Sequence, residues 1–391
     1  MQQPENILIS GGWGYGNLGD DAILNATIKL TRAKYPNAKL NVCTYSIPQE
    51  KIIYNNCEFH FSTHRLLFGE SAFKFLHTYK KSPFPPYLFE RIANRLKHYL
   101  PKSDIKPNYP ALNSIEPLFK AADMFIMSGG GYFNNWRESF LSRCSELQLA
   151  HRYQVPSFII GQTLDDFLPN YKEKVKPLLK QCRAISVRDE DSKRILGNMD
   201  ITSSVAPDLV LGGIDFEPLI HPGNEIVFIP AELPLSNADN ILQSVADFAM
   251  GNELIVNIAI TRLYNADIRC ARRTFHKLRN HGVNVKLKIP NTFSDIAKQI
   301  IGAKFVVSRN LHGLILGYIG GAKVLSLHHG WKFKGFLQQI NTPQLYIDAG
   351  SANKSDILNK LYSTYNSSLH IEVRKQLRRT VTENFNTLIS L

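Results

Sequence analysis

Residues 11–21 carry five glycines and read Gly11-Gly12-Trp13-Gly14-Tyr15-Gly16-Asn17-Leu18-Gly19-Asp20-Asp21. A short apolar run, Ile7-Leu8-Ile9, precedes them and a stretch with helical spacing follows, which predicts a strand, a glycine-rich turn and a helix. Glycine lets a ligand approach main-chain N–H groups, and the N-terminus of a helix adds free donors and partial positive charge. We therefore expect an anionic group to bind here; a tight turn that binds nothing is the alternative.

The kind of anion is narrowed by what the stretch lacks. It has no Gly-Lys-Ser/Thr ending, which excludes an ordinary P-loop NTPase. Gly14, Gly16 and Gly19 match the dinucleotide fingerprint, but Tyr45-Ser46 follow the expected second strand, where that motif needs an acidic residue for the ribose. The fingerprint is therefore weak evidence for a dinucleotide.

The rest of the chain repeats the alternation of strand and helix. Its 391 residues are enough for two domains, and short apolar runs alternate with helical patterns on both sides of a Gly- and Pro-rich linker at 212–223. This predicts an α/β fold of two doubly wound, Rossmann-like domains, at 1–211 and 224–370, followed by a C-terminal helix at 371–391. The expected strands are 7–10, 40–44, 124–127, 157–160, 184–187, 226–229, 254–258, 283–287, 305–307, 324–327 and 345–347.

Residues 50–117 interrupt this alternation with clustered prolines and aromatic residues, and are predicted to be an insertion in the first domain. Basic and aromatic residues concentrate between Phe61 and Lys106, within a chain of net charge +13 and pI near 9.4. Such a mixture is typical of an interfacial helix at a membrane, of a single-stranded nucleic acid groove, or of a solvated cover over the sheet. A nucleic acid partner rests on charge alone, and we expect none.

The cysteines and the apolar runs indicate the cellular compartment in which we expect the protein. Met1 to Glu5 lacks the regions of a signal peptide, and no apolar run approaches the roughly 18 residues of a membrane span. Five scattered cysteines predict reduced thiols rather than disulfides or zinc. We expect a cytoplasmic protein, with a peripheral contact at the inner membrane face left open by the basic insertion. The oligomeric state stays open.

Open parallel sheets bind ligands beyond the carboxyl ends of their strands. Two expected strands end in candidate binding residues: Gly129, Gly130 and Gly131 follow the strand at 124–127, and Gly161-Gln162 follow the strand at 157–160. Three successive glycines exceed the need of a plain turn, so we expect them to contact an anion or a sugar hydroxyl.

Arg188 follows the strand at 184–187, where a buried guanidinium needs an anion. A salt bridge to Asp189 or Asp208 is the structural alternative. Asp189 itself is predicted as the N-cap of the next helix, and because capping accounts for Asp189 and Asp191, we expect no metal there.

His312 follows the strand at 305–307 and begins an otherwise apolar helix, with Arg309 before it and Gly313 after it. Histidine is the side chain best suited to proton transfer near neutral pH. A catalytic or anion-binding role is favoured over that of an ordinary core histidine.

Taken together, these stretches resemble the polysaccharide pyruvyl transferase family. The matching segments are Gly14-Tyr15-Gly16-Asn17-Leu18-Gly19-Asp20-Asp21-Ala22-Ile23-Leu24, Gly129-Gly130-Gly131, Gly161-Gln162, Ser186-Val187-Arg188-Asp189 with Ser192, Pro207-Asp208, Leu311-His312-Gly313 and Lys332 with Gly335-Phe336-Leu337. The resemblance implies facing Rossmann-like domains similar to GT-B glycosyltransferases. It also implies transfer of the pyruvyl group of phosphoenolpyruvate, as donor substrate and without a cofactor, to two hydroxyls of a sugar in a glycan or lipid-linked saccharide.

By resemblance, Arg188 and His312 are the donor-binding and catalytic residues. Arg309, Gly313 and Lys332 are expected to assist donor binding. The acceptor is expected to contact Gly14, Gly16, Asn17, Gly19, Asp20, Gly129, Gly130, Gly131 and Gln162, with no metal.

One departure from the family stands out: Asn310 occupies the position, two residues before His312, where the family usually has an arginine. Arg309 takes over its role through a local shift, or donor binding differs. A nucleotide-sugar-dependent GT-B-type glycosyltransferase and a non-catalytic glycan-binding relative are the alternative functions.

Overall fold

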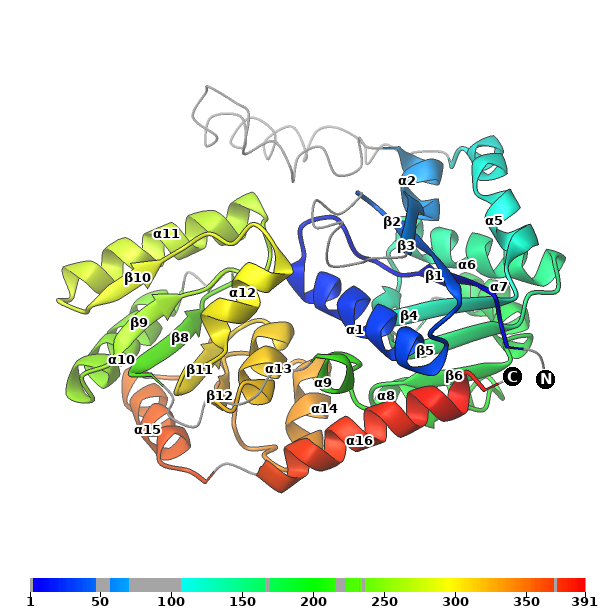
Figure 1. Ribbon diagram of the computed structural model, residues 1–391. Helices are drawn as coiled ribbons and strands as arrows, with labels where there is room; N and C mark the ends of the chain where they lie inside the picture. Colours follow the sequence, from blue (N-terminus) through cyan, green and yellow to red (C-terminus); the bar gives the residue numbers. More distant parts are fainter. Residues whose placement is uncertain are drawn as a thin grey trace.

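The computed structural model describes residues 3–46, 57–69, 107–165, 167, 169–214, 223–231, 233, 236–368 and 371–390. Within them the chain forms two parallel sheets, one of seven strands and one of five, which lie side by side with helices packed around them (Figure 1). The predicted α/β fold with two doubly wound sheets is confirmed.

The first sheet has the order β3-β2-β1-β4-β5-β6-β7, with every pair parallel. Its strands are β1 (Asn6–Ser10), β2 (Lys39–Thr44), β3 (Cys57–Phe61), β4 (Met124–Phe133), β5 (Ser157–Leu164), β6 (Ala184–Val187) and β7 (Ser204–Val205). The chain progresses outward from β1 to β3 and then returns to the other side of β1 at β4. The connections therefore diverge at the carboxyl ends of β1 and β4, which is where open sheets bind ligands.

The second sheet repeats this plan, with the order β10-β9-β8-β11-β12 and every pair parallel. Its strands are β8 (Glu225–Ile229), β9 (Ile255–Ile258), β10 (Val285–Leu287), β11 (Phe305–Ser308) and β12 (Lys323–Ser326). The corresponding switch point lies between β8 and β11.

The helices follow the strands in alternation. The first half contains α1 (Leu18–Lys34), α2 (Thr63–Phe68), the 3-10 helix η3 (Tyr109–Ser114), α5 (Glu116–Ala121), α6 (Arg137–Arg152), α7 (Pro169–Lys180), α8 (Glu190–Gly197) and α9 (Val210–Gly213). The second half contains α10 (Ala238–Gly251), α11 (Asn265–Asn280), α12 (Phe293–Ile300), α13 (Leu311–Ile319), α14 (Trp331–Gln339), α15 (Lys354–Tyr365) and α16 (Ile371–Leu388).

Local chemistry accounts for where the important helices begin. Asn17 caps α1 by accepting a hydrogen bond from the N–H of Gly19, and two carboxylates in the first turn complement the helix dipole. Asp189 caps α8 by accepting from the N–H of Ser192 at 2.7 Å, so the predicted N-cap is confirmed. Asn310 caps α13 in the same way, through the N–H of Gly313.

The structure differs from the sequence analysis in three segments. Residues 50–117 are not wholly an insertion, because Cys57–Phe61 forms β3 at the sheet edge; residues 70–106, which include most of the basic and aromatic stretch, lie outside the described part of the chain. Residues 345–347 form only one bridge, Tyr346 to Ser326, since turns on either side confine them. The short strand β7 was missed because two residues carry no periodicity.

The glycines near 129 and 212 also behave differently from expectation. Gly129, Gly130 and Gly131 do not end a strand, because β4 continues through them to Phe133, paired with β5 past a local irregularity. Gly212 and Gly213, expected to begin a linker, lie in helix α9. A Cβ at Gly212 would lie 2.5 Å from Val381, and one at Gly213 would lie 2.4 Å from Ala26, so these glycines allow close helix packing. The division into domains at 211 and 224 stays a prediction.

The predicted C-terminal helix is confirmed as α16, which crosses from the second sheet back to the first (Figure 1). Its buried face carries Leu377, Val381 and Phe385. The Tyr35 hydroxyl donates to the carbonyl of Ile389, which ties the end of the chain to the first half. Helix α16 therefore acts as a strap over both halves.

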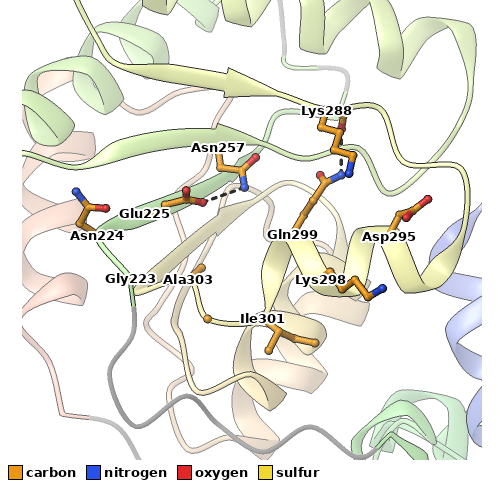
Figure 2. Close-up of a pocket in the computed structure, with 11 residues that line it drawn as sticks. Gly223, Asn224, Glu225, Asn257, Lys288, Asp295, Lys298, Gln299, Ile301 and Ala303 are labelled. Carbon is orange, nitrogen blue, oxygen red and sulfur yellow. Dashed lines mark hydrogen bonds between the residues drawn. The ribbon is translucent and has the colours of Figure 1, made fainter.

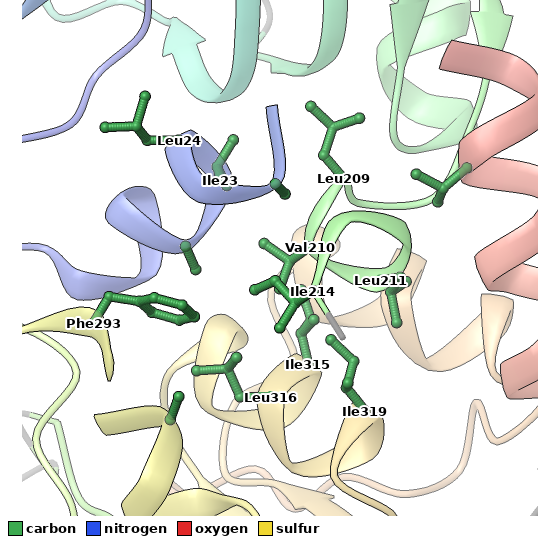
Figure 3. Packing of buried hydrophobic residues seen from close by; sticks show 14 of the residues in the cluster. Ile23, Leu24, Leu209, Val210, Leu211, Ile214, Phe293, Ile315, Leu316 and Ile319 are labelled. Atoms are coloured by element: carbon green, nitrogen blue, oxygen red, sulfur yellow. The ribbon is translucent and has the colours of Figure 1, made fainter. Parts of the chain in front are cut away.

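One continuous apolar cluster fills the space between the two sheets. Figure 3 shows side chains from α1, α9, α12 and α13 meeting there, among them Ile23, Val210, Phe293 and Ile315. Burial of apolar surface contributes roughly 25 cal/mol per Å². The two halves are therefore held together by a common hydrophobic core rather than by a polar surface contact.

We expect Phe385→Ala to lower the free energy of unfolding by about 3–5 kcal/mol, because the ring is fully buried under α16 and its removal leaves a cavity. Urea unfolding followed by circular dichroism measures the change. Glu383→Ala, on the exposed face of the same helix, serves as the control and should stay within about 0.5 kcal/mol of the unmodified protein. Equal urea midpoints for the two variants would show that the packing of α16 does not stabilise the protein.

Candidate active site

The candidate residues come from the carboxyl ends of strands in both sheets. Arg188 follows β6, and the glycine stretch at 11–19 follows β1. His312 follows β11, and Lys332 follows β12 at the start of α14. Parallel strands place their carboxyl ends on one edge of each sheet, and here the two edges face each other.

The glycine loop is fastened to the second half by its backbone. The N–H of Leu18 donates to the carbonyl of Thr261 at 2.9 Å, and the N–H of Leu263 donates to the carbonyl of Gly16 at 2.7 Å. Gly14 and Gly16 have φ of +81° and +94°, a conformation that favours glycine. The N–H of Gly14 is used inside the loop, since it donates to Asp21.

Two glycines of the first half make room for side chains of the second half. A Cβ on Gly19 would lie 2.2 Å from Nδ1 of His312, and a Cβ on Gly131 would lie 2.6 Å from Nζ of Lys332. Contacts under 3.0 Å essentially never occur at a real Cβ, so a side chain at either position would displace its neighbour. Gly19 and Gly131, which the sequence assigned to ligand binding, thus seat protein side chains.

The His312 side chain is buried, and its Nε2 lies 3.9 Å from Oδ2 of Asp208. In the described part of the chain, Nε2 makes no hydrogen bond. Burial lowers the pKa of His312 below its ordinary value; the charges of Asp208 and Asp20 act in the opposite direction, and those of Arg188 and Lys332 lower it further. The imidazole is therefore poised to accept a proton at neutral pH.

Arg188 is the other buried polar centre. Its Nε donates to Thr163 Oγ1 and its Nη1 to Asp208 Oδ2, both at 2.6 Å. The salt bridge that the sequence left as an alternative is therefore present, and its partner is Asp208. Since the same carboxylate oxygen also faces His312, Asp208 joins the guanidinium to the imidazole.

Helix α14 brings Lys332 to this group. Gln339, at the other end of α14, donates to the carbonyl of Arg188 at 2.8 Å, and a Cβ on Gly335 would lie 3.3 Å from the Cβ of Asp189. Burial lowers the pKa of Lys332, and the neighbouring Arg188 acts in the same direction. The ammonium therefore lies in a partly desolvated position close to the guanidinium.

Asp20 lies in the first turn of α1 and faces His312. Its Oδ2 accepts from the Tyr15 hydroxyl and from Asn17 Nδ2, and burial raises the pKa of the Asp20 carboxyl. Burial and the Asp20 carboxylate in turn raise the pKa of Tyr15, Tyr132 and Tyr264. Sequence reasoning missed these tyrosines; Tyr15 and Tyr132, each set among glycines, were the available signal.

The remaining predicted residues lie near this group with partners of their own. Arg309 Nη1 donates to the carbonyl of Ala231 at 3.0 Å, and its charge lowers the pKa of His328. The N–H of Gly313 donates to Asn310, and a Cβ at Gly313 would lie 2.3 Å from Ile229. Asn310, where the family usually has an arginine, thus serves as a helix cap.

Gln162 is completely buried, and its amide donates to the carbonyl of Ser128 at 2.7 Å. It bridges β5 to β4 beneath the site. Gly129, Gly130 and Gly131 likewise lie within β4, with Gly130 at a φ of +109°.

A polar hollow of about 430 Å³ lies at another edge of the molecule (Figure 2). Glu225, Asn257, Lys288 and Gln299 line it, and Glu225 is the first residue of β8. The hollow therefore opens at the amino end of that strand, opposite the edge that carries His312.

Within the described ranges, no three His, Cys, Asp or Glu side chains gather in a way that could hold a metal ion. Among the helices described, none is long and apolar enough to cross a membrane.

The model of the family described as polysaccharide pyruvyl transferase matches residues 17–329. The chain belongs to this family. The match begins at Asn17, near the end of the glycine loop, and covers Arg188, Asp208 and His312; it confirms the resemblance drawn from the sequence. Membership implies a transferase that uses a pyruvyl donor and a glycan acceptor. No curated protein sequence matches the chain.

Several solved structures are similar to this chain, among them three that are named for, or were solved with, UDP or a UDP-sugar. The UDP-GlcNAc 2-epimerase of Methanocaldococcus jannaschii has a TM-score of 0.58 at 8% identity and covers 98% of this chain and 99% of its own. The UDP-GlcNAc 2-epimerase of Neisseria meningitidis, bound to UDP-GlcNAc, has a TM-score of 0.54 at 14% identity and covers 98% and 99%. Anabaena Alr3699/HepE, in complex with UDP and glucose, has a TM-score of 0.53 at 8% identity and covers 99% and 96%. At these identities the likeness shows the GT-B-like fold alone.

We expect Gly19→Ala to reduce transferase activity by about 100-fold, because the new methyl group would displace the His312 ring and small displacements of a reacting group are costly. Steady-state kinetics measures the loss, and NMR of the His312 ring reports its movement. Gly197→Ala is the matched control, since apart from its chain neighbours and the backbone of its own helix no atom lies within 4 Å of its Cβ position. Full activity in Gly19→Ala would show that the position of the His312 ring does not depend on the absence of a side chain at residue 19.

Proposed function

We propose that the protein transfers the pyruvyl group of phosphoenolpyruvate to two hydroxyls of a sugar in a glycan, forming a ketal. The observation that supports this proposal most is the buried group of Arg188, Asp208 and His312 beside Lys332, assembled from both halves. Phosphoenolpyruvate carries a carboxylate and a phosphate, and guanidinium and ammonium groups are the side chains that bind such anions.

In this reaction the methylene carbon of the donor gains a proton, and two sugar oxygens bond to the neighbouring carbon. The bond from that carbon to the phosphate oxygen breaks, and its electron pair leaves with the phosphate. Two hydroxyl protons are released; one balances the proton taken up by the methylene carbon, and the other leaves with phosphate or solvent. A residue that both accepts and donates a proton is needed.

His312 fills that role in this proposal. Its lowered pKa leaves the ring neutral at pH 7, so it first accepts a hydroxyl proton and then delivers a proton to the methylene carbon. Arg188 binds the donor through the guanidinium nitrogen Nη2, because Nε and Nη1 already donate to Thr163 and Asp208. Lys332 supports the leaving phosphate, with Arg309 and the Gly313 region assisting donor binding.

The acceptor hydroxyls lie in this proposal between His312 and the Asp20 side chain, with Asn17 alongside. Asp20 faces the imidazole and carries a carboxyl whose pKa burial has raised, which suits it to share a hydroxyl proton. The glycines of the loop and of β4 contribute by holding His312 and Lys332 close to this point.

The direct test incubates the purified protein with phosphoenolpyruvate and a panel of glycosides, and follows phosphate release and the gain of a pyruvyl mass. We expect turnover, and a loss of about 1000-fold or more in His312→Ala and Arg188→Ala, because each removes a group that contacts the reacting atoms. His281→Ala and Arg194→Ala, which alter exposed residues of the same types, are the matched controls.

Two results would overturn the proposal. Absence of turnover together with absence of a thermal shift by phosphoenolpyruvate would exclude the donor. A thermal shift by UDP-GlcNAc and glycosyl transfer would favour a GT-B-type glycosyltransferase, whereas glycan binding without either donor would favour a non-catalytic relative.

The pH profile of kcat/KM tests the role of Asp208. The neutral imidazole is the active form of the free enzyme, so activity should rise with pH through the pKa of His312. The Asp208 carboxylate raises that pKa, and Asp208→Asn removes its charge, so the acid limb should move to lower pH while overall activity falls. Asp191→Asn, at an exposed carboxylate, should leave the limb in place. If the acid limb of the kcat/KM profile stays in place in Asp208→Asn, Asp208 does not affect the pKa of His312.

A further inference from the structure

A second hollow lies at the carboxyl ends of β1, β2 and β4 and at the start of α2, beside the candidate active site. It has a volume of about 50 Å³, and nearly all of its larger side chains are aromatic: Trp13, Tyr15, Tyr45, His64, Tyr132 and Trp136. We call it the aromatic pocket. A lining of aromatic side chains with a few polar groups is typical of ligand-binding sites.

The aromatic pocket shares two walls with the active site. The Tyr15 hydroxyl donates to Asp20, and the Asp20 carboxylate raises the pKa of Tyr132. Asp20 in turn faces His312, whose pKa it raises. A molecule bound against Tyr15 and Tyr132 therefore lies next to the carboxylate and the imidazole that we place in proton transfer.

The rings that line the aromatic pocket are held in fixed positions by their neighbours. The Tyr132 ring is enclosed by two glycines, since a Cβ on Gly12 or on Gly130 would lie 2.2 Å from it. Trp13 is fully buried and its indole N–H donates to the carbonyl of Cys43. Rings fixed in this way present a preformed surface and lose little freedom when a ligand binds.

The polar groups of the aromatic pocket leave it without net charge. Arg143 lines it but is buried and paired with Glu146 at 2.8 Å. Burial, with a contribution from Arg143, lowers the pKa of His64 to about 4, so its ring is neutral at physiological pH. The aromatic pocket therefore suits an uncharged group rather than the anionic donor.

Size limits what can enter. A water molecule needs roughly 10–15 Å³ of such space, so about 50 Å³ holds roughly three to five waters or one compact substituent, and not a sugar ring. Trp136, by contrast, is 47% exposed although it lines the aromatic pocket. Its indole offers an accessible apolar face on which the C–H face of a sugar can stack.

We propose that the aromatic pocket is the acceptor subsite: the sugar ring stacks on Trp136, and one small uncharged substituent of that sugar, the size of an acetamido group, enters the aromatic pocket. This assignment rests on the proposed function, and it names the acceptor as an N-acetylated sugar unit. Its hydroxyls then point along Tyr15 and Tyr132 toward Asp20 and His312.

Saturation-transfer NMR with methyl N-acetylglucosaminide and methyl glucoside, without phosphoenolpyruvate, tests this directly. The N-acetylated probe should bind about tenfold more tightly than methyl glucoside, and Trp136→Ala should weaken its binding by about tenfold, while Trp136→Phe restores most of it. Tyr109→Ala, which removes an aromatic ring that is 51% exposed on η3, is the matched control and should bind normally. The thermal shift with phosphoenolpyruvate should be unchanged in all variants.

Equal binding of the two probes, or unchanged binding in Trp136→Ala, would overturn the acceptor subsite. Binding that depends on Trp136 but is accompanied by no turnover with phosphoenolpyruvate would support the subsite and contradict pyruvyl transfer. Turnover with phosphoenolpyruvate, with an acceptor KM that is the same in Trp136→Ala as in the unmodified protein, would support pyruvyl transfer and contradict the acceptor subsite.

Discussion

His312 reaches the carboxyl edge of the first sheet because residue 19 has no side chain. The imidazole of the second half occupies the space that a Cβ would take, and the same relation holds between Lys332 and Gly131. These two contacts require the halves to approach closely, and the apolar cluster shared by α1, α9, α12 and α13 stabilises that approach. The packing between the two sheets therefore also determines the geometry of the active site.

The same approach explains why the charged groups are buried. Moving Arg188, Asp208 and Asp20 away from water is costly. The ion pair of Arg188 with Asp208, the hydrogen bond from Arg188 to Thr163 and the hydrogen bonds that Asp20 accepts from Tyr15 and Asn17 offset part of that cost. Buried charges that perturb one another's pKa are typical of functional sites. In this protein they come from four separate strand ends, so a donor anion would meet them only where the two halves face each other.

The sequence predicted much of this arrangement, because the relevant signals are local. Except for β3, the strands of four or more residues were predicted, as were the Asp189 cap and the C-terminal helix α16, since each depends on periodicity or on a hydrogen bond within a few residues. Strand β3 and the extension of β4 through its glycines were not foreseen. Both depend on pairing with strands that lie far away in the sequence.

The candidate site residues could likewise be predicted from the sequence, whereas the residues that they contact could not. The sequence by itself determined the family, two doubly wound sheets and the candidates Arg188, His312 and Lys332, because motif residues at strand ends follow from local order. Only the tertiary structure decided that Asp208 joins Arg188 to His312, that Arg309 donates to the carbonyl of Ala231, and that Gly19 and Gly131 make room for His312 and Lys332. The physical reason is that these contacts join residues more than fifteen positions apart, and their existence depends on how closely the two sheets pack.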